Sequence, residues 1–243
     1  MTVISALEAC AFNAWPARQT VFYEGWILRL ANGYTKRANS ANAWQPTASF
    51  DAVRSYVEAL YQRQGLPTIF RLTPLAGDEP DRQLEAAGYQ QVDPTEVMTL
   101  PVGNRRANGD TIILEPMRSS TWSDGFALLN GLDAIHRQQH NALLDTIAWP
   151  VAYATVYEEG QLIGYGLAVA EGDWVGLFDV VVAPAWRGRG HGRQLVKKLI
   201  EWGKTQGARQ AYLQVTCSNS AALALYRSLG FETRYRYHYR VLS

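Results

Sequence analysis

The chain has 243 residues, of which 47% are hydrophobic and 12% aromatic, and its formal net charge is +1. This composition is typical of a globular protein and not of a disordered one. So small a charge gives no overall field to recruit nucleic acid or an anionic membrane, and no run of about 18 apolar residues could span a bilayer. We therefore expect neither a nucleic-acid partner nor a membrane partner.

Cysteine usage and the first residues indicate the cellular compartment. Cys10 and Cys217 give neither a disulfide framework nor the spacing of metal ligands. Residues 1–8 lack the basic region and the long apolar core of a secretory signal. We expect a cytoplasmic protein with reduced cysteines and no metal.

The first part of the chain alternates helical and extended patterns. The apolar run over 21–30 predicts a strand, and Asn32-Gly33 predicts a hairpin that returns over 34–42, because Asn-Gly favours tight hairpin turns. Around these we expect a helix over 5–13, a helix over 50–64, a strand over 68–72, a helix over 81–87 and an extended segment over 89–100.

A stretch rich in Gly and Asn over 101–110 indicates a linker between two units. Beyond it we expect a strand over 111–115, a helix over 120–130 capped by Ser or Thr, strands over 153–157 and 161–170, and a half-buried terminal strand over 234–240. His136 and His140 lie four residues apart without a third ligand, which favours a solvated helix face over a metal site.

The segment that starts at Leu177 has the pattern of a strand, a glycine loop and a helix. The apolar run over 177–182 predicts a buried strand that Pro184 ends. Gly188, Gly190 and Gly192 follow at alternate positions, and the apolar residues after them recur at helical spacing. Glycines let backbone N–H groups converge, and a helix N-terminus adds its positive dipole end, so this loop is suited to phosphate or pyrophosphate.

Cationic side chains alternate with those glycines. Arg187, Arg189 and His191 would add donors around a bound phosphate. The alternative is a tight strand–helix connection with solvated arginines. The loop matches neither the Walker pattern nor the dinucleotide fingerprint.

Two motifs resemble one family. Arg187-x-x-Gly190-x-Gly192 after a Val-rich strand resembles the acetyl-CoA loop of the GNAT N-acetyltransferases, and the segment 219–231 resembles their helix-and-strand motif N-x-x-A-x-x-L-Y-x-x-x-G-F. The clear match covers roughly residues 145–240. It implies an α/β (α+β) fold, with a mixed, mostly antiparallel sheet flanked by helices, and acetyl-CoA as co-substrate.

The two halves of the chain also resemble each other. A shift of 142 positions (207 minus 65) lays Gly65 on Gly207, and the same shift lays Gly88 on Gly230. The chance alternative is that two α/β units merely share helix spacing. We interpret the pattern as two fused GNAT-like units.

The first copy lacks the residues that would do chemistry. The glycine loop falls on 45–50, where there is no glycine, and Tyr226 falls on Leu84. We therefore expect a degenerate unit over 1–104, which shapes the protein and selects the acceptor, and a catalytic domain over 105–243.

The resemblance assigns cofactor-binding roles. Backbone groups of Val180, Val181 and Val182 would pair with the pantetheine arm as an added strand, and the loop 187–192, with Gly188, Arg189 and His191, would hold the pyrophosphate. Asn219 would bind the pantetheine amides, cap a helix, or do both.

Catalytic roles are less evenly supported. Tyr226 aligns with the family's general acid, which protonates the leaving thiolate; otherwise it is a packed tyrosine. The ribosomal-protein branch has a base Glu where this chain has Gln214, which cannot accept a proton. Asp179 is the substitute candidate, although its alternation with Val180 would point it to the opposite face, as a sheet anchor. A water chain or selection of the neutral amine would also serve.

We thus expect an N-acetyltransferase that moves an acetyl group from acetyl-CoA to a primary amine of a small molecule, in a ternary complex, as a monomer or homodimer. The alternatives are a protein N-terminus or lysine as acceptor, transfer to oxygen or of a longer acyl group, and a non-catalytic CoA-binding or interaction module.

Overall fold

The computed structural model describes residues 2–103 and 111–242, so most of the expected linker lies outside the described residues. The chain forms two compact units. The first comprises Met1–Val97, Val215–Asn219 and Thr233–Ser243, and the second comprises Met98–Gln214 and Ser220–Glu232. The end of the chain therefore belongs to the first unit, while a boundary of the repeat at residue 104 stays a prediction.

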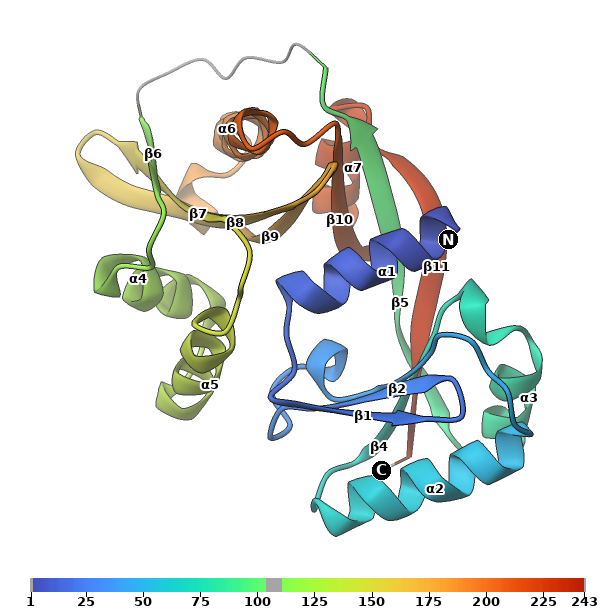
Figure 1. Cartoon of the computed structure of the whole chain (residues 1–243). Coiled ribbons are helices and arrows are strands. Elements are labelled where there is room, and N and C mark those ends of the chain that lie inside the picture. Colours follow the sequence, from blue (N-terminus) through green and yellow to red (C-terminus); the bar gives the residue numbers. More distant parts are fainter. Residues whose placement is uncertain (1, 104–110, 243) are drawn as a thin grey trace. The chain divides into compact units, whose positions relative to one another are not determined.

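The first unit is a small mixed sheet between helices (Figure 1). Its strands follow the order β1-β2-β3-β4-β11, and every pair except β3–β4 is antiparallel. Helices α1 and α2 lie on opposite faces of β1–β4. Its elements are α1 (Val3–Ala14), β1 (Gln19–Tyr23), β2 (Trp26–Leu30), a 3₁₀ helix (Lys36–Ala38), β3 (Ala41–Ala43), α2 (Phe50–Arg63), β4 (Thr68–Leu72), a 3₁₀ helix (Pro74–Ala76), α3 (Glu79–Ala86), the first part of β5 (Gln90–Pro101) and most of β11 (Glu232–Leu242).

The predicted hairpin is wrong in position. The run 21–30 is not one strand, because it turns at Glu24 and Gly25, whose φ values are 44° and 75°. Two successive positive φ angles are those of the tight turn that matches strand twist, and β1 pairs with β2 across it. A Cβ on Gly25 would lie 1.7 Å from the carbonyl oxygen of Gln45, so this position requires glycine.

The expected return strand over 34–42 is also wrong except at its end. Asn39 is buried, and its amide takes over the hydrogen bonds that a strand ladder would make. Its Oδ1 accepts from the N–H groups of Ala31 and Gly33 at 2.7 and 3.0 Å, and its Nδ2 donates to the carbonyls of Tyr34 and Thr35. The segment therefore forms a compact loop before β3.

The second unit carries the segment with the glycine loop. Its strands follow the order β10-β9-β8-β7-β6, with β9–β10 parallel and the other pairs antiparallel. Helix α6 covers one face of β7–β9, and α4 and α5 lie on the other (Figure 1). Its elements are β6 (Ile112–Glu115), α4 (Ser120–Asn130), α5 (Ala134–Leu144), β7 (Val151–Glu158), β8 (Gln161–Glu171), β9 (Trp174–Val182), a 3₁₀ helix (Pro184–Trp186), α6 (His191–Thr205), most of β10 (Gln210–Thr216) and α7 (Ser220–Ser228).

Both units therefore have the mixed, mostly antiparallel sheet with flanking helices that the sequence predicts. The repeat is visible in matching hydrogen bonds. The N–H of Tyr89 donates to the carbonyl of Leu84 at 3.0 Å, and the N–H of Phe231 donates to that of Tyr226 at 3.1 Å. These two bonds are related by the same shift that relates the glycines at the ends of the helices.

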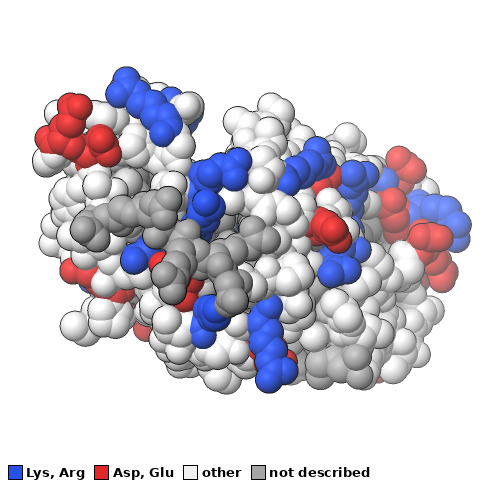
Figure 2. All heavy atoms as spheres, turned by 90° about the horizontal axis from the view of Figure 1, so that it is seen from above, with Lys and Arg blue, Asp and Glu red and all other residues white. Residues whose placement is uncertain are grey.

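Within residues 2–103 and 111–242, no helix is both long and apolar enough to cross a bilayer. Acidic and basic side chains are interspersed over the face drawn in Figure 2, in keeping with the net charge of +1. Neither observation singles out a partner.

Candidate active site

Strand β9 continues past its pairing with β10. The paired residues run from Trp174–Gln210 to Leu177–Leu213, and β9 goes on to Val182. On its other edge the pairing with β8 extends to the end of the strand. Among the described residues, the last stretch of β9, with Val180, Val181 and Val182, therefore has one edge that its parallel neighbour does not pair. Such an edge accepts an extended ligand through main-chain hydrogen bonds.

A β-bulge lies just before this stretch. The β8–β9 register shifts between Tyr165 and Leu167, and Asp179 adopts a φ of 53°, which a non-glycine residue rarely does. The bulge interrupts simple alternation, so alternation with Val180 does not by itself fix the face to which Asp179 points, and its roles as base or sheet anchor both stay predictions. Its side chain reaches His140 of α5 and is 11% exposed.

The loop after β9 presents helix N–H groups without a side-chain cap. Gly188 and Gly190 have φ values of 76° and 90°, which glycine adopts without strain. Gly190 caps α6, and the bond from the N–H of Gln194 to the carbonyl of Gly190 is 3.1 Å. The N–H groups before Gln194 have no acceptor within the helix, an arrangement that at the positive end of a helix suits an anion.

Three side chains of the loop are held by neighbours. The Nε of Arg187 donates to the carbonyl of Val182 at 2.9 Å, and the guanidinium of Arg189 lies 4.9 Å from the ring centroid of Trp186. The Nδ1 of His191 lies 3.8 Å from a carboxylate oxygen of Glu158. Both arginines remain exposed, so their charges face the solvent beside the loop.

Gly192 brings three elements together. A Cβ at this position would lie 3.4 Å from Leu225 of α7 and 3.9 Å from Val182 of β9. Arg193, next in α6, donates to the hydroxyl of Ser228 at 2.6 Å. The strand end, the glycine loop and α7 thus converge.

Tyr226 lies on α7 beside that point of convergence. It is 8% exposed, and its ring packs edge-on against Phe231 with the centroids 5.8 Å apart. Burial raises the pKa of Tyr226 to about 12. Within the described residues its hydroxyl makes no hydrogen bond, which leaves it available as a donor.

Two further polar candidates precede α7 in the chain. Asn219 is exposed and belongs to the first unit, where its N–H donates to the carbonyl of Thr216 at 3.0 Å. Gln214 is half-buried near the end of β10. Their contributions to binding therefore stay predictions.

Sequence reasoning missed a buried histidine. His136 is exposed and pairs with Asp133 at 2.9 Å, as a solvated helix face predicts. His140 is 1% exposed, and its Nε2 lies 2.9 Å from Oδ2 of Asp179, so for His140 the predicted solvated face is wrong. Leu143 and Leu144, three and four residues later, are buried too, and this spacing was the signal for a buried face.

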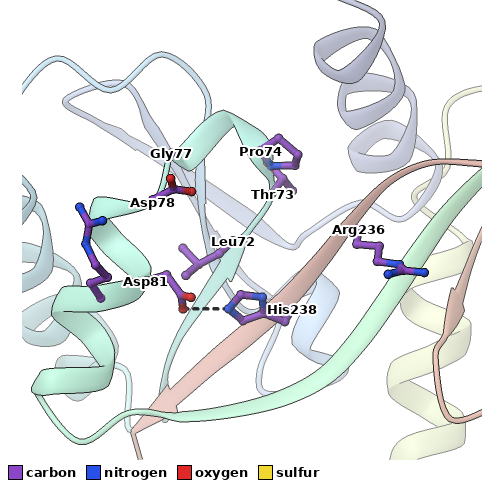
Figure 3. A pocket seen from close by; sticks show the side chains of 9 residues that line it. Leu72, Thr73, Pro74, Gly77, Asp78, Asp81, Arg236 and His238 are labelled. Carbon is purple, nitrogen blue, oxygen red and sulfur yellow. Dashed lines mark hydrogen bonds and ion pairs between the residues drawn. The ribbon is translucent and has the colours of Figure 1, made fainter.

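No group of three or more His, Cys, Asp or Glu side chains among the described residues is placed to hold a metal ion. A cavity of about 500 Å³ lies in the first unit (Figure 3), and none of the predicted site residues lines it. Its lining residues are Leu72, Thr73, Pro74, Gly77, Asp78, Asp81, Arg82, Arg236 and His238. His238 is bonded to Asp81 at 2.9 Å, and Arg236 is paired with Glu96 at 2.7 Å.

Comparison with known proteins gives a consistent picture. A family model described as "Probable histone acetyltransferase Rv0428c C-terminal" matches residues 2–240. The "Uncharacterized N-acetyltransferase YobR" of Bacillus subtilis (strain 168) is 31% identical, covering 99% of this chain and 99% of its own. The "Probable histone acetyltransferase Rv0428c" of Mycobacterium tuberculosis is 30% identical over 98% of this chain and 73% of its own.

A solved structure shares the fold over nearly the whole length. It is described as a "Tandem GNAT protein from the clavulanic acid biosynthesis pathway (without AcCoA)". It is 13% identical and superposes with a TM-score of 0.69, over 97% of this chain and 87% of that one.

Proposed function

The chain belongs to the acetyltransferase family represented by the C-terminal region of Rv0428c, a tandem form of the GNAT N-acetyltransferases, and from that premise we propose that its second unit acetylates the primary amine of a small molecule. One observation carries the assignment: Gly192 joins the strand end, the glycine loop and α7 at a single point. The first unit lacks the loop, and we assign it the selection of the acceptor.

The loop fits the pyrophosphate of acetyl-CoA. Gly188 and Gly190 keep the backbone open, and the uncapped N–H groups of α6 point at the space where an anion would bind. Arg187 and Arg189 add positive charge. The unpaired edge of β9 would hold the pantetheine arm, and Asn219 is proposed to bind its amides.

The chemistry needs a proton donor and a proton acceptor. Acetyl-CoA would supply the acetyl thioester, which the neutral amine attacks at the carbonyl carbon as the C–S bond breaks. Tyr226 is the proposed donor to the leaving sulfur. Its pKa of about 12 keeps it loaded with a proton at neutral pH, although it makes the transfer to a thiolate of pKa about 8.5 more uphill than from a solvated phenol.

Asp179 is the proposed acceptor of the amine proton. Its carboxylate is partly exposed on the bulge directly before the unpaired edge of β9, where an attacking amine would approach. A backbone N–H of that edge is the proposed donor to the oxyanion that develops on the carbonyl.

A second acceptor class is favoured by the name of one relative. Rv0428c is described as a probable histone acetyltransferase, which makes a protein lysine the alternative acceptor. The two acceptor classes differ in what must reach the site: a free small molecule, or a lysine side chain attached to a polypeptide.

The proposed function is tested by following CoA release from acetyl-CoA with a panel of amino acids, polyamines, aminoglycosides and short lysine peptides. We expect turnover with a free small amine. Turnover with the lysine peptides alone would replace the small-molecule acceptor by a protein. Tight binding of acetyl-CoA without turnover on any amine would favour a binding module.

A further inference from the structure

The bond between His140 and Asp179 joins two elements that are far apart in sequence. His140 lies on α5 and Asp179 lies on β9, 39 positions later, and their Nε2 and Oδ2 atoms are 2.9 Å apart. The carboxylate oxygen can only accept when ionised, so the ring nitrogen donates to it in that state. This is a charge-assisted hydrogen bond in a site with little water.

The two partners differ in access to solvent. Asp179 keeps 11% of its side chain exposed, whereas that of His140 keeps 2%. A substrate could therefore touch the carboxylate, while the imidazole can act only through it. The ring of His140 is fixed by stacking, with centroids 4.7 Å from Phe126 and 6.1 Å from Trp122.

The backbone also fixes the carboxylate. Asp179 sits in the bulge with a φ of 53°, a conformation that Asp and Asn tolerate better than most residues. The bulge turns the side chain toward α5. Rigid backbone on one side and a buried donor on the other leave the carboxylate little freedom.

We propose that His140 is a positioning residue for the acetyl-transfer reaction: its Nε2–H holds Asp179 by one oxygen and leaves the other oxygen to take the proton of the attacking amine. The inference rests on the proposed function for its kinetic part. No atom is exchanged between the two residues in this role. The amine proton moves to Asp179 and leaves to solvent after the acetyl group has been transferred.

Few other titratable groups face the pair. Tyr153 of β7 and Tyr165 of β8 contact Trp122, which stacks on His140. Burial raises the pKa of Tyr153 to about 12, with Asp179 adding to the effect, and burial also raises the pKa of Tyr165. Both tyrosines therefore stay neutral between about pH 5 and 9.

Charged groups near this region are themselves paired. From α4 and α5 come Asp124 with Arg137, at 2.7 Å, and Asp145 with Arg118, also at 2.7 Å. On the opposite face of the sheet, α6 presents Leu195 and Leu199 near Gly166, which faces the bulge.

The kinetic test uses two substitutions of one residue. His140→Leu removes the donor, and we expect kcat/KM to fall on the order of 10²-fold, mostly in kcat. His140→Gln keeps an N–H donor, so it should restore most of the activity. Equal losses in both variants would reduce His140 to a packing residue.

A matched control lies on the same helix. His136 is exposed and lies four residues before His140. His136→Gln and His136→Leu should therefore leave kcat and KM within about twofold of those of the unmodified enzyme. A loss of kcat/KM in the His136 variants as large as that in His140→Leu would overturn the assignment to His140.

A spectroscopic test does not depend on activity. The chain has four histidines, so the ring ¹⁵N signals can be assigned by substitution. We expect Asp179→Asn, a substitution by a residue that also tolerates a positive φ, to change the ring ¹⁵N chemical shifts of His140 and not those of His136. Unchanged His140 signals would overturn the pairing. If the pairing holds but no amine is acetylated, the proposed function fails and the positioning role fails with it.

Discussion

Tyr226 and Leu84 occupy equivalent places in the two repeats. Each accepts a backbone hydrogen bond from an aromatic residue five positions later, so the local fold is the same. The side chain of Tyr226 carries a hydroxyl, which has no hydrogen-bond partner among the described residues, whereas that of Leu84 carries no hydroxyl. At this position the two copies therefore share the local backbone structure and differ in the chemistry of the side chain.

Tyr226→Phe tests that hydroxyl directly. We expect kcat to fall on the order of 10²-fold with little change in KM for acetyl-CoA, because the ring stays and the proton donor is lost. The melting temperature should change little, because the hydroxyl has no partner to lose. Turnover equal to that of the unmodified enzyme would contradict the acid role.

Tyr61→Phe is a matched control in the first unit. The hydroxyl of Tyr61 is buried and donates to the carbonyl of Arg29 at 2.8 Å. Its removal leaves that carbonyl with one bond fewer, and we expect a loss of about 1–2 kcal/mol in unfolding free energy without a change in kcat. Chemical denaturation and steady-state kinetics separate the two effects.

The raised pKa of Tyr226 also predicts a loss of stability in alkali. A tyrosine that ionises at about 12 in the folded state and about 10 in the unfolded state contributes stability that is full below pH 10 and lost as the pH rises toward 12. The loss amounts to about 2–3 kcal/mol. Denaturant midpoints at pH 9 and 11.5 should fall less in Tyr226→Phe than in the unmodified protein, and equal falls would contradict the shift.

Some residues of the site can be predicted from short stretches of sequence, and others only from the folded structure. The glycine loop and Tyr226 sit within short contiguous motifs, and the resemblance of these motifs to those of a known family predicts their roles. His140 and Asp179 are 39 positions apart, and only the packing of α5 on the sheet makes them partners. The bulge at Asp179 likewise depends on pairing with β8, which alternation along one strand cannot reveal.

At the scale of elements, the N-cap residue of α6 has no side chain that could bond to the first N–H groups of the helix. Gly190 has a φ of 90° and no atom within 4 Å of a Cβ built on it, so only backbone conformation requires glycine there. The helix predicted over 50–64 agrees with α2, because the signals for a helix end are local. The β1–β2 hairpin was not predicted correctly, because Asn39 holds the Asn32-Gly33 loop by contacts that the turn dipeptide does not encode.

Gly190→Ala should weaken the binding of acetyl-CoA. The substitution strains the loop by about 1 kcal/mol and turns the N–H groups from their common target, so we expect KM for acetyl-CoA to rise about tenfold with a smaller change in kcat. Isothermal titration with CoA gives an independent measure.

Gly207→Ala is the control for that experiment. Gly207 has a φ of 94°, equally open surroundings and a place at the other end of α6. It should cost similar stability and leave CoA affinity unchanged. Equal losses of affinity in both variants would assign the effect to helix α6 and not to the loop.

At the scale of the molecule, the first unit is completed by the end of the chain. Strand β11 pairs with β4 from His238–Leu72 to Leu242–Thr68. Tyr235 of β11 donates to Glu8 of α1, which is also ion-paired with the buried Arg71. Removing one partner of a buried ion pair strongly destabilises a protein, because the other charge is left buried without compensation. This cluster therefore holds α1 and β11 to the same core.

A fragment of residues 1–104 should therefore not fold cooperatively. It lacks β11 and leaves the edge of β4 open. We expect no sigmoidal transition in its thermal or denaturant unfolding. Appending residues 232–242 through a flexible linker should restore one. A cooperative transition of the bare fragment would show that β11 is dispensable.

The place of β11 has a consequence for synthesis on the ribosome. Domains of most multidomain proteins fold in turn, the N-terminal one first, while translation continues. If the first unit needs β11, the edge of β4 stays open while the whole second unit is synthesised. Folding of the first unit would then follow synthesis of the second, and chains truncated before β11 would be expected clients of chaperones.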